Sequence, residues 1–149
     1  MYKLEKFVNF LLPNQLKTKN KQMKDNKLYA FINNTVQKKI PINSGYANGY
    51  VAVPPEHPYH GKHYDDVDVE IHGGLTFSEN ASEIKDWTED TECLNFNNIQ
   101  EIPNNYWVFG FDTFHYADDE KLDRTWCVAE TERLMEQLSQ KQENKTQVQ

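Results

Sequence analysis

In the central part of the chain, apolar residues come in short runs that contain glycine or stop at proline, and this favours short strands over long helices. Residues 49–53 (Gly-Tyr-Val-Ala-Val) stop at Pro54. Residues 106–111 form a second, aromatic run, in which Gly110 allows a neighbouring group to approach closely. Each run is predicted to form a strand.

Residues 66–72 alternate acidic and apolar side chains and end in a histidine. A period of two places each kind on its own face of a strand, so the segment is predicted to be a strand with one apolar and one acidic face. After two glycines, the strand is predicted to continue through residues 75–77. Residues 79–104 are polar and irregular, and we expect them to form a flap or lid.

The C-terminal region has the clearest helical pattern. Thr125 can cap a helix there, and the tail after Ser139 has almost no apolar residue, which is typical of disorder. One face of the predicted helix carries Cys127, Thr131, Leu134 and Leu138.

Lysine dominates the N-terminal part of the chain. Residues 1–40 hold nine lysines and two acidic residues, whereas the rest holds seven basic and 21 acidic residues. Residues 3–12 are predicted to form a short amphipathic helix. A second segment has the apolar spacing of a helix but is short enough to be a strand instead. Its residues are Leu28, Phe31, Ile32 and Thr35. The acidic body does not favour nucleic acid as a partner.

These patterns together predict an α+β fold: a small, mainly antiparallel sheet with a C-terminal helix packed on it and a helical N-terminal extension. We expect a lysine-rich extension at residues 1–44, a core domain at 45–138 and a disordered tail at 139–149. No apolar run approaches the roughly 18–20 residues of a membrane span, and no apolar signal-peptide stretch begins the chain. A cytoplasmic protein without membrane contact is therefore expected.

All five histidines lie between His57 and His115, so candidate chemistry concentrates there. His72 stands at the end of the predicted acidic strand, before two glycines and close to Thr76. Exposed backbone N–H groups at such glycines can hold an anion, and an imidazole beside them can act as general acid or base. The alternative is a surface histidine with no chemical role.

Asp112 and His115 have the spacing D-x-x-H. They can pair as carboxylate and imidazole, with the carboxylate fixing the tautomer, or both can ligate a metal. The aromatic residues on both sides of His115 fit a half-buried structural histidine equally well.

A divalent metal is a further candidate cofactor. His57, His60 and His63 lie three residues apart and precede Asp65 and Asp66, which together offer nitrogen and oxygen ligands. Clusters of this kind are also found simply solvated, and no local metalloenzyme motif fixes the geometry.

Aromatic side chains offer a different type of contact. Tyr64 and Trp107 can stack on a nucleobase, although aromatic residues in strands more often belong to the core.

Several short motifs follow one another in a fixed order. They are Gly49-Tyr50-Val51, His57-Pro58, Gly61, Tyr64-Asp65-Asp66, Ile71-His72-Gly73-Gly74-Leu75-Thr76, Gly110-Phe111-Asp112, His115 and Glu130 to Leu134. Through these motifs and their order, the chain resembles a family of small, uncharacterised bacteriophage and prophage proteins. The resemblance covers about residues 45–138. It departs from that family at Ile71, where valine is expected, and at Glu56, where glycine is expected. His60 and His63 are not fixed in the family, which weakens a three-histidine metal site.

The resemblance implies a shared polar set but no established activity. This set consists of His57, Asp65, Asp66, His72, Asp112 and His115. The first hypothesis is a phage accessory protein, in the cytoplasm of a bacterial host, that counters host defence. It would bind, and in one version hydrolyse, a small nucleotide-like immune signal. The catalytic candidates are His72, His115 and Asp112, and the ligand-binding candidates are His57, Tyr64, Asp66, Thr76 and Trp107.

Two alternatives remain open. One is a metal-dependent hydrolase whose divalent metal is held by His57, Asp66, His72, Asp112 and His115. The other is a non-enzymatic interaction module that inhibits a host protein, with the N-terminal arm docking on its partner. Assembly into a homo-oligomer is compatible with each hypothesis.

Overall fold

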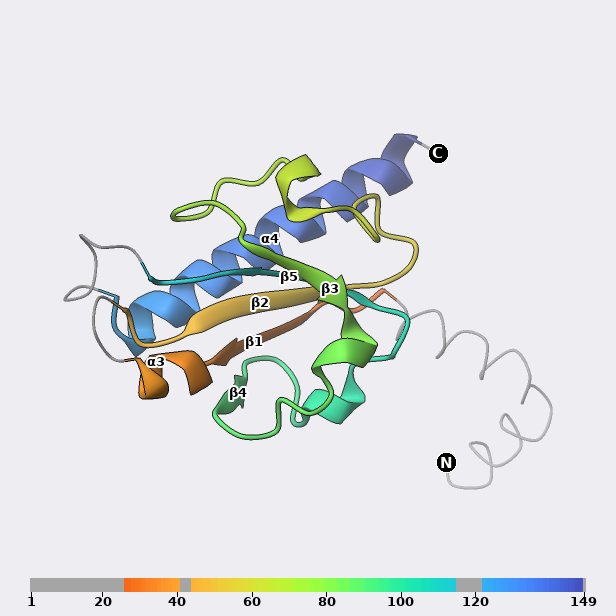
Figure 1. Ribbon diagram of the computed structural model, residues 1–149. Coiled ribbons are helices and arrows are strands. Elements are labelled where there is room, and N and C mark those ends of the chain that lie inside the picture. Colours follow the sequence, from red (N-terminus) through yellow and green to blue (C-terminus); the bar gives the residue numbers. More distant parts are fainter. Residues whose placement is uncertain (1–25, 41–43, 115–121, 149) are drawn as a thin grey trace, which may run out of the picture.

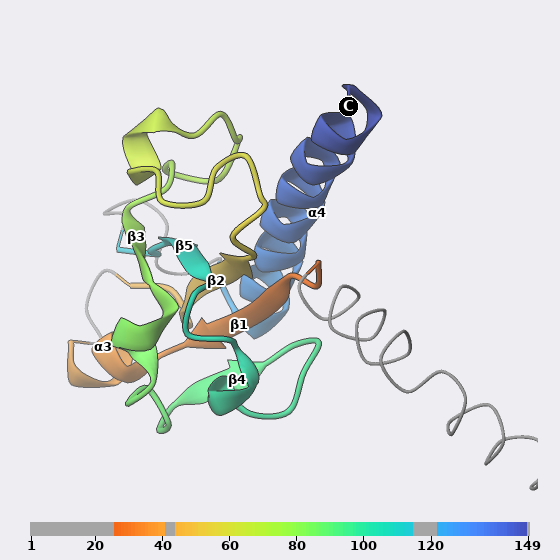
Figure 2. The same cartoon turned by 90° about the vertical axis from the view of Figure 1, so that its right-hand side faces the viewer.

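The computed structural model describes residues 26–40, 44–114 and 122–148. The strands are β1 (Tyr29–Asn33), β2 (Asn48–Val53), β3 (Phe77–Asn80), β4 (Thr91–Cys93) and β5 (Trp107–Phe111). They form one antiparallel sheet in the order β3-β5-β2-β1-β4 (Figure 1). The helices are α3 (Thr35–Lys39) and α4 (Arg124–Val148), with short 3-10 helices η1 (Tyr64–Asp66), η2 (Ala81–Ile84) and η3 (Ile99–Glu101). Figure 2 shows α4 on one side of the sheet, and the predicted α+β fold is confirmed.

α4 covers the sheet with the face that the sequence pattern predicts. All four residues of that face are buried: Cys127, Thr131, Leu134 and Leu138. The two leucines join Val51 and Phe109 in one core cluster between helix and sheet. The helix begins at Arg124, so Asp123, and not Thr125, caps it: the Asp123 carboxylate accepts a hydrogen bond from Trp126 N at 2.9 Å.

The segment predicted as a flap, residues 79–104, instead forms a second core on the opposite face of the sheet. Its apolar side chains are few, but Ala81, Ile84, Phe96, Ile99 and Ile102 are all buried. Lys85 donates to the carbonyls of Gln100 and Ile102, and the Gln100 side chain donates to Lys85 O at 2.7 Å. The prediction of a flap was wrong because a polar segment with well-spaced apolar residues can still be integral to a core.

The predicted strand at residues 66–72 is also wrong, although its alternation is real. Val67, Val69 and Ile71 pack into the core under α4, while Glu70 is exposed. The backbone does not pair with a strand in the described sheet. Gln137 of α4 accepts from Glu70 N at 2.8 Å and donates to Glu70 O at 3.0 Å. Helix side chains therefore satisfy groups that a strand would pair in a ladder.

β1 lies between β2 and β4, so the strand interpretation of this segment is right and the helical one is wrong. All five of its residues are buried. A central strand covered on both faces shows no alternation, and this explains why its spacing resembled a helix. The boundary at residue 44 accordingly cuts through the sheet. The helix predicted at residues 3–12 lies outside the described residues.

α4 continues to Val148, through most of the tail predicted to be disordered. Lys141 pairs with Asp68 at 3.6 Å, and the Gln142 amide donates to Asn26 O at 3.5 Å. Glutamine, lysine and glutamate are good helix formers, and polarity alone does not end a helix. None of the helices in the described ranges is long and apolar enough to cross a membrane.

Candidate functional site

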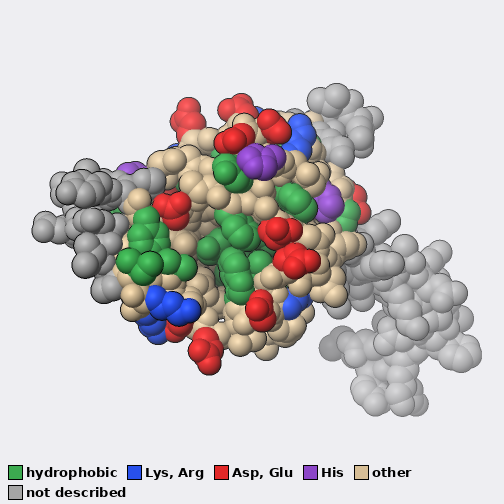
Figure 3. All heavy atoms as spheres, in the orientation of Figure 1, with side chains coloured by type: hydrophobic (Ala, Val, Ile, Leu, Met, Phe, Trp, Pro, Cys, Tyr) green, Lys and Arg blue, Asp and Glu red, His purple; other side chains and the backbone are tan. Residues whose placement is uncertain are grey.

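A cavity of about 410 Å³ opens on the sheet face opposite α4. We call it the Trp87 cavity, and it is lined by Asn33, Thr35, Val36, Tyr50, Asp86, Trp87, Thr88 and Glu89. Figure 3 shows this side of the molecule, with hydrophobic side chains gathered at its centre and acidic side chains beside them. The volume lies within the range of roughly 300–1,000 Å³ that is typical of small-molecule sites.

Tyr50 forms the floor of the Trp87 cavity. It lies on β2 directly opposite Gly110 of β5. A Cβ at Gly110 would lie 2.6 Å from Tyr50 Cε1, so only glycine leaves room for the tyrosine ring. The ring stacks on Phe31 with centroids 5.1 Å apart, and it meets Trp87 edge to face at 5.1 Å. The prediction that Gly110 allows a close approach is confirmed.

Trp87 forms the aromatic wall. It follows η2, where its backbone N–H donates to Ile84 O at 3.1 Å. Its indole contacts the rings of Phe77 and Phe31, with centroids 5.5 and 6.5 Å away. The core therefore holds one side of the half-buried indole in place, while the rest of its surface lines the cavity.

The polar rim of the cavity is fixed by hydrogen bonds, most of which join residues far apart in the sequence. The Asn33 amide donates to Thr91 Oγ1 at 2.8 Å and to Glu89 O at 3.3 Å, and Asn33 Oδ1 accepts from Thr35 N at 3.0 Å. The Thr35 hydroxyl donates to Asp90 Oδ2 at 3.3 Å. These bonds join α3, β1 and the turn before β4, so the rim is preorganised.

A buried amide network lies next to the floor. The Gln37 amide donates to Asn48 Oδ1 at 2.6 Å and to Thr113 Oγ1 at 3.3 Å, and the Asn48 amide donates to the Tyr50 hydroxyl at 3.4 Å. Gln37 Oε1 is buried and lacks a hydrogen-bond partner within the described part of the chain. An acceptor left unsatisfied in this way is destabilising unless a donor reaches it.

Burial raises the pKa of Tyr50 from 10.0 to about 12, with the Asn48 hydrogen bond opposing the shift and the charge of Asp112 adding to it.

Because the pKa of Tyr50 is higher in the folded than in the unfolded chain, protonation of Tyr50 stabilises the fold. This stabilisation is complete below about pH 10 and is lost as pH rises through 12. We expect a loss of roughly 2–3 kcal/mol over that window. Urea denaturation at pH 9 and pH 11.5 should show a smaller loss in Tyr50→Phe than in the wild type. Tyr46→Phe, at an exposed tyrosine, should behave as the wild type. Equal losses of stability in the wild type and both variants would contradict the assignment of this pH dependence to Tyr50.

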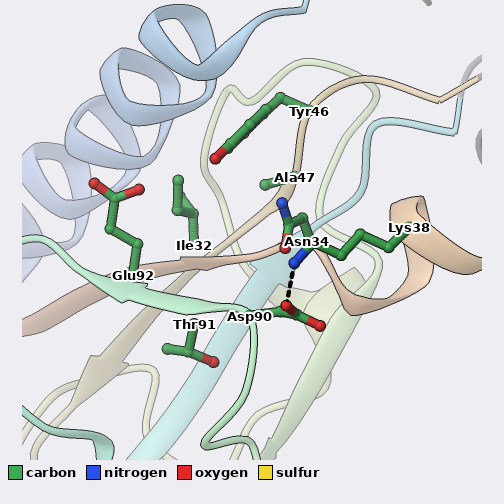
Figure 4. Close-up of a pocket in the computed structure, with 8 residues that line it drawn as sticks. All are labelled: Ile32, Asn34, Lys38, Tyr46, Ala47, Asp90, Thr91 and Glu92. Atoms are coloured by element: carbon green, nitrogen blue, oxygen red, sulfur yellow. Dashed lines mark hydrogen bonds and ion pairs between the residues drawn. The ribbon is translucent and has the colours of Figure 1, made fainter.

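A smaller cavity, of about 210 Å³, lies beside β4 (Figure 4). Its residues are Ile32, Asn34, Lys38, Tyr46, Ala47, Asp90, Thr91 and Glu92. Its charges are already compensated, because Lys38 pairs with Asp90, and Glu92 pairs with Arg124. The Arg124 hydrogen bond outweighs burial and lowers the pKa of Glu92. This cavity is consequently the weaker candidate for a charged ligand.

His57 has a structural role in this arrangement. It is buried, its Nδ1 accepts from Tyr59 N at 3.0 Å, and its Nε2 lies 2.8 Å from Leu138 O. An Nδ1 that accepts leaves the proton on Nε2, which then donates to the helix carbonyl. The ring ties the loop after β2 to α4, and neither ring nitrogen is directed toward a ligand.

His72 lies on the α4 side of the sheet and not in the Trp87 cavity. Its ring meets Trp126 edge to face at 5.1 Å, and its backbone N–H donates to Glu130 at 3.0 Å. Burial alone would raise the pKa of Glu130, but hydrogen bonds from Arg133 and from His72 N outweigh it and leave this pKa lowered. The contacts of His72 are thus with the helix that covers the core.

The other predicted ligand-binding residues are dispersed. Trp107 donates from its indole to Lys62 O at 2.9 Å, and Tyr64 packs beside His63 with centroids 4.1 Å apart. Thr76 donates its N–H to Gly110 O at 2.9 Å, and Asp66 is exposed on η1. Trp107 and Tyr64 both pack against the core cluster under α4. None of these four residues lines the Trp87 cavity.

Asp112 follows β5 and accepts a hydrogen bond from Phe114 N at 3.0 Å. His115 lies outside the described residues, so the predicted pairing of Asp112 with His115 stays a prediction. Among the described residues, no three histidine, cysteine or carboxylate side chains gather in a way that could hold a metal ion.

Reasoning from the sequence missed the residues that line the cavity, above all Trp87 and Asn33. Trp87 stands in a polar segment with no periodicity, and Asn33 ends a strand that resembled a helix. One available signal was the isolated tryptophan itself, because a large aromatic residue within a polar segment needs a surface to cover it.

Comparison of the chain with protein-family models, curated proteins and solved structures finds no match. The resemblance to bacteriophage proteins therefore stays a prediction, carried by the motifs themselves.

Proposed function

We propose that the protein is a small-molecule binder that captures a flat ring in the Trp87 cavity. The observation that carries the proposal is the pairing of a half-buried indole with a buried tyrosine ring in a preorganised cavity of about 410 Å³. A flat ring in the cavity can pack against the aromatic atoms that these two side chains contribute to the lining. The threonine hydroxyls of the lining add hydrogen-bonding groups that can orient the ring.

Binding without catalysis is supported by the kinds of residue in the lining. Its titratable side chains, within the described chain, are Asp86, Glu89 and Tyr50. Both carboxylates are exposed, and the pKa of Tyr50 is about 12, far above the range useful for acid or base catalysis near neutral pH. A protein of this kind acts by withholding its ligand.

The ligand that we propose is a nucleotide-like signal that enters by its base. The biological role that we propose is that of a phage accessory protein that counters host defence in the bacterial cytoplasm. This role follows from the resemblance over residues 45–138. A nucleobase fits the aromatic wall, while any phosphate would have to remain outside, because the lining contributes two carboxylates and, among described residues, no lysine or arginine.

The decisive variant is Trp87→Ala. We expect at least one of adenosine, guanosine, cytidine and uridine to bind the wild type in calorimetric titrations. Loss of the stacked indole should weaken that binding about tenfold or more, since stacking on an aromatic side chain contributes about 1–3 kcal/mol. Trp87→Phe should retain part of the affinity because a ring remains.

The matched control is Trp107→Phe, which alters an indole under α4 and outside the Trp87 cavity. It should leave nucleoside affinity unchanged. Thermal melts of all variants distinguish lost binding from lost folding. The proposal fails if Trp87→Ala, while folded, binds as tightly as the wild type, or if none of the four nucleosides binds.

A further inference from the structure

Resting on the proposed function, we infer that the Trp87 cavity selects the charge of the ring that enters it: it favours an aromatic ring that carries a protonated amine or comparable N–H donors over a neutral or anionic one.

The charges of the lining all have one sign. Asp86 and Glu89 line the cavity, and its described lining contains no lysine or arginine. Lys38 of α3 lines the smaller cavity and is paired with Asp90. Hydrogen bonding to Asp90 raises the pKa of Lys38. The charged side chains of the described lining are therefore both negative, which favours a cation in the Trp87 cavity.

Hydrogen-bonding capacity has the same bias. The Asn33 amide donates to Glu89 O and Thr91, and the Thr35 hydroxyl donates to Asp90. These two donors are engaged inside the protein, whereas the carboxylates of Asp86 and Glu89 are exposed acceptors. A ligand that complements these carboxylates supplies donors, and charged N–H groups make the strongest bonds to them.

The aromatic wall favours the same class of ligand. Trp87 and Tyr50 both line the cavity, and their rings meet edge to face. The face of an indole attracts a cation more strongly than other side-chain rings do. A phosphate or carboxylate in this position would meet two like charges and gain no compensating contact from the ring face. The carboxylates and the indole thus act together to select a cation.

Three probes of nearly equal size separate charge from ring binding: phenethylamine, 2-phenylethanol and phenylacetate. At pH 7 they are cationic, neutral and anionic. In ligand-observed NMR titrations at low salt, we expect phenethylamine to bind about five-fold more tightly than 2-phenylethanol, and phenylacetate to bind more weakly than either. Raising the salt concentration should shrink the difference, because the carboxylates are exposed.

The test variant is the double substitution Asp86→Asn with Glu89→Gln, which keeps side-chain shape and removes both charges. It should abolish the preference for the cation, so that phenethylamine and 2-phenylethanol bind with equal affinity. The matched control is Glu132→Gln with Glu136→Gln, two exposed positions on α4 that line a different surface groove. This control changes the net charge equally and should keep the preference.

Equal binding of cation and neutral probe, or equal loss in the test and control variants, overturns charge selection and leaves the ring-binding role intact. Failure of all three probes also overturns it, and the nucleoside titrations then decide the proposed function independently. A cation preference that only the cavity variant removes supports it.

Discussion

Replacing Gly49 by alanine is expected to lower the free energy of unfolding by about 3 kcal/mol, a large part of the stability of a domain of this size. A Cβ at this position would lie 2.5 Å from Phe111 Cζ and closer still to the Thr131 hydroxyl. Neither neighbour can retreat easily. Phe111 lies in the core on β5, and the Thr131 hydroxyl donates to Cys127 O at 2.7 Å within α4. The clash would push α4 away from the centre of the sheet.

Gly61→Ala is the matched control. Gly61 has a φ of 81°, but nothing lies within 4 Å of a Cβ built there. Its substitution carries only the backbone cost of the left-handed conformation, about 1 kcal/mol. Urea denaturation followed by tryptophan fluorescence should therefore rank Gly49→Ala well below Gly61→Ala in stability. Equal midpoints would mean that α4 does not pack against β2 as described.

The parts of the fold that were predictable are those in which the sequence alone sets the local structure. Pro54 directly follows β2, β5 is an aromatic run, and the period of the buried positions on α4 follows from helix geometry. The prediction for β1 was ambiguous, because a strand buried on both faces has no period of two. The alternation at residues 66–72 was read as a strand, because a sequence does not state that its backbone partner will be Gln137.

The site was less predictable than the fold for a related reason. Histidines were singled out for their chemistry, yet the role of His57 depends on a carbonyl 81 residues away, that of Leu138. The residues that do line a cavity are ordinary core and loop types, such as Tyr50 and Thr35. Their importance comes from tertiary packing, with Gly110 under the tyrosine ring and Trp87 beside it. A single sequence reports residue types, whereas a cavity is a property of their arrangement.

Tyr106→Ala is the second substitution with a large expected effect, because it tests whether residues 81–106 belong to the core. Tyr106 is fully buried and meets Tyr29 edge to face at 5.4 Å. Its carbonyl accepts from Ala81 N at 2.9 Å, which joins the two ends of the segment. Removing so large a buried ring should lower the free energy of unfolding by about 4 kcal/mol. A tyrosine on a mobile flap would contribute far less.

The control is Tyr46→Ala, because Tyr46 is 40% exposed and its loss should change stability by less than about 1 kcal/mol. Limited proteolysis adds a local measurement. In the wild type, residues 81–106 should resist cleavage at a temperature well below the melting transition, and Tyr106→Ala should expose them. Because Trp87 is held by this segment, nucleoside binding should fall in the same variant before global unfolding. If Tyr106→Ala changed neither stability nor proteolysis, the segment would be a mobile flap after all. The wall of the Trp87 cavity would then be free to move.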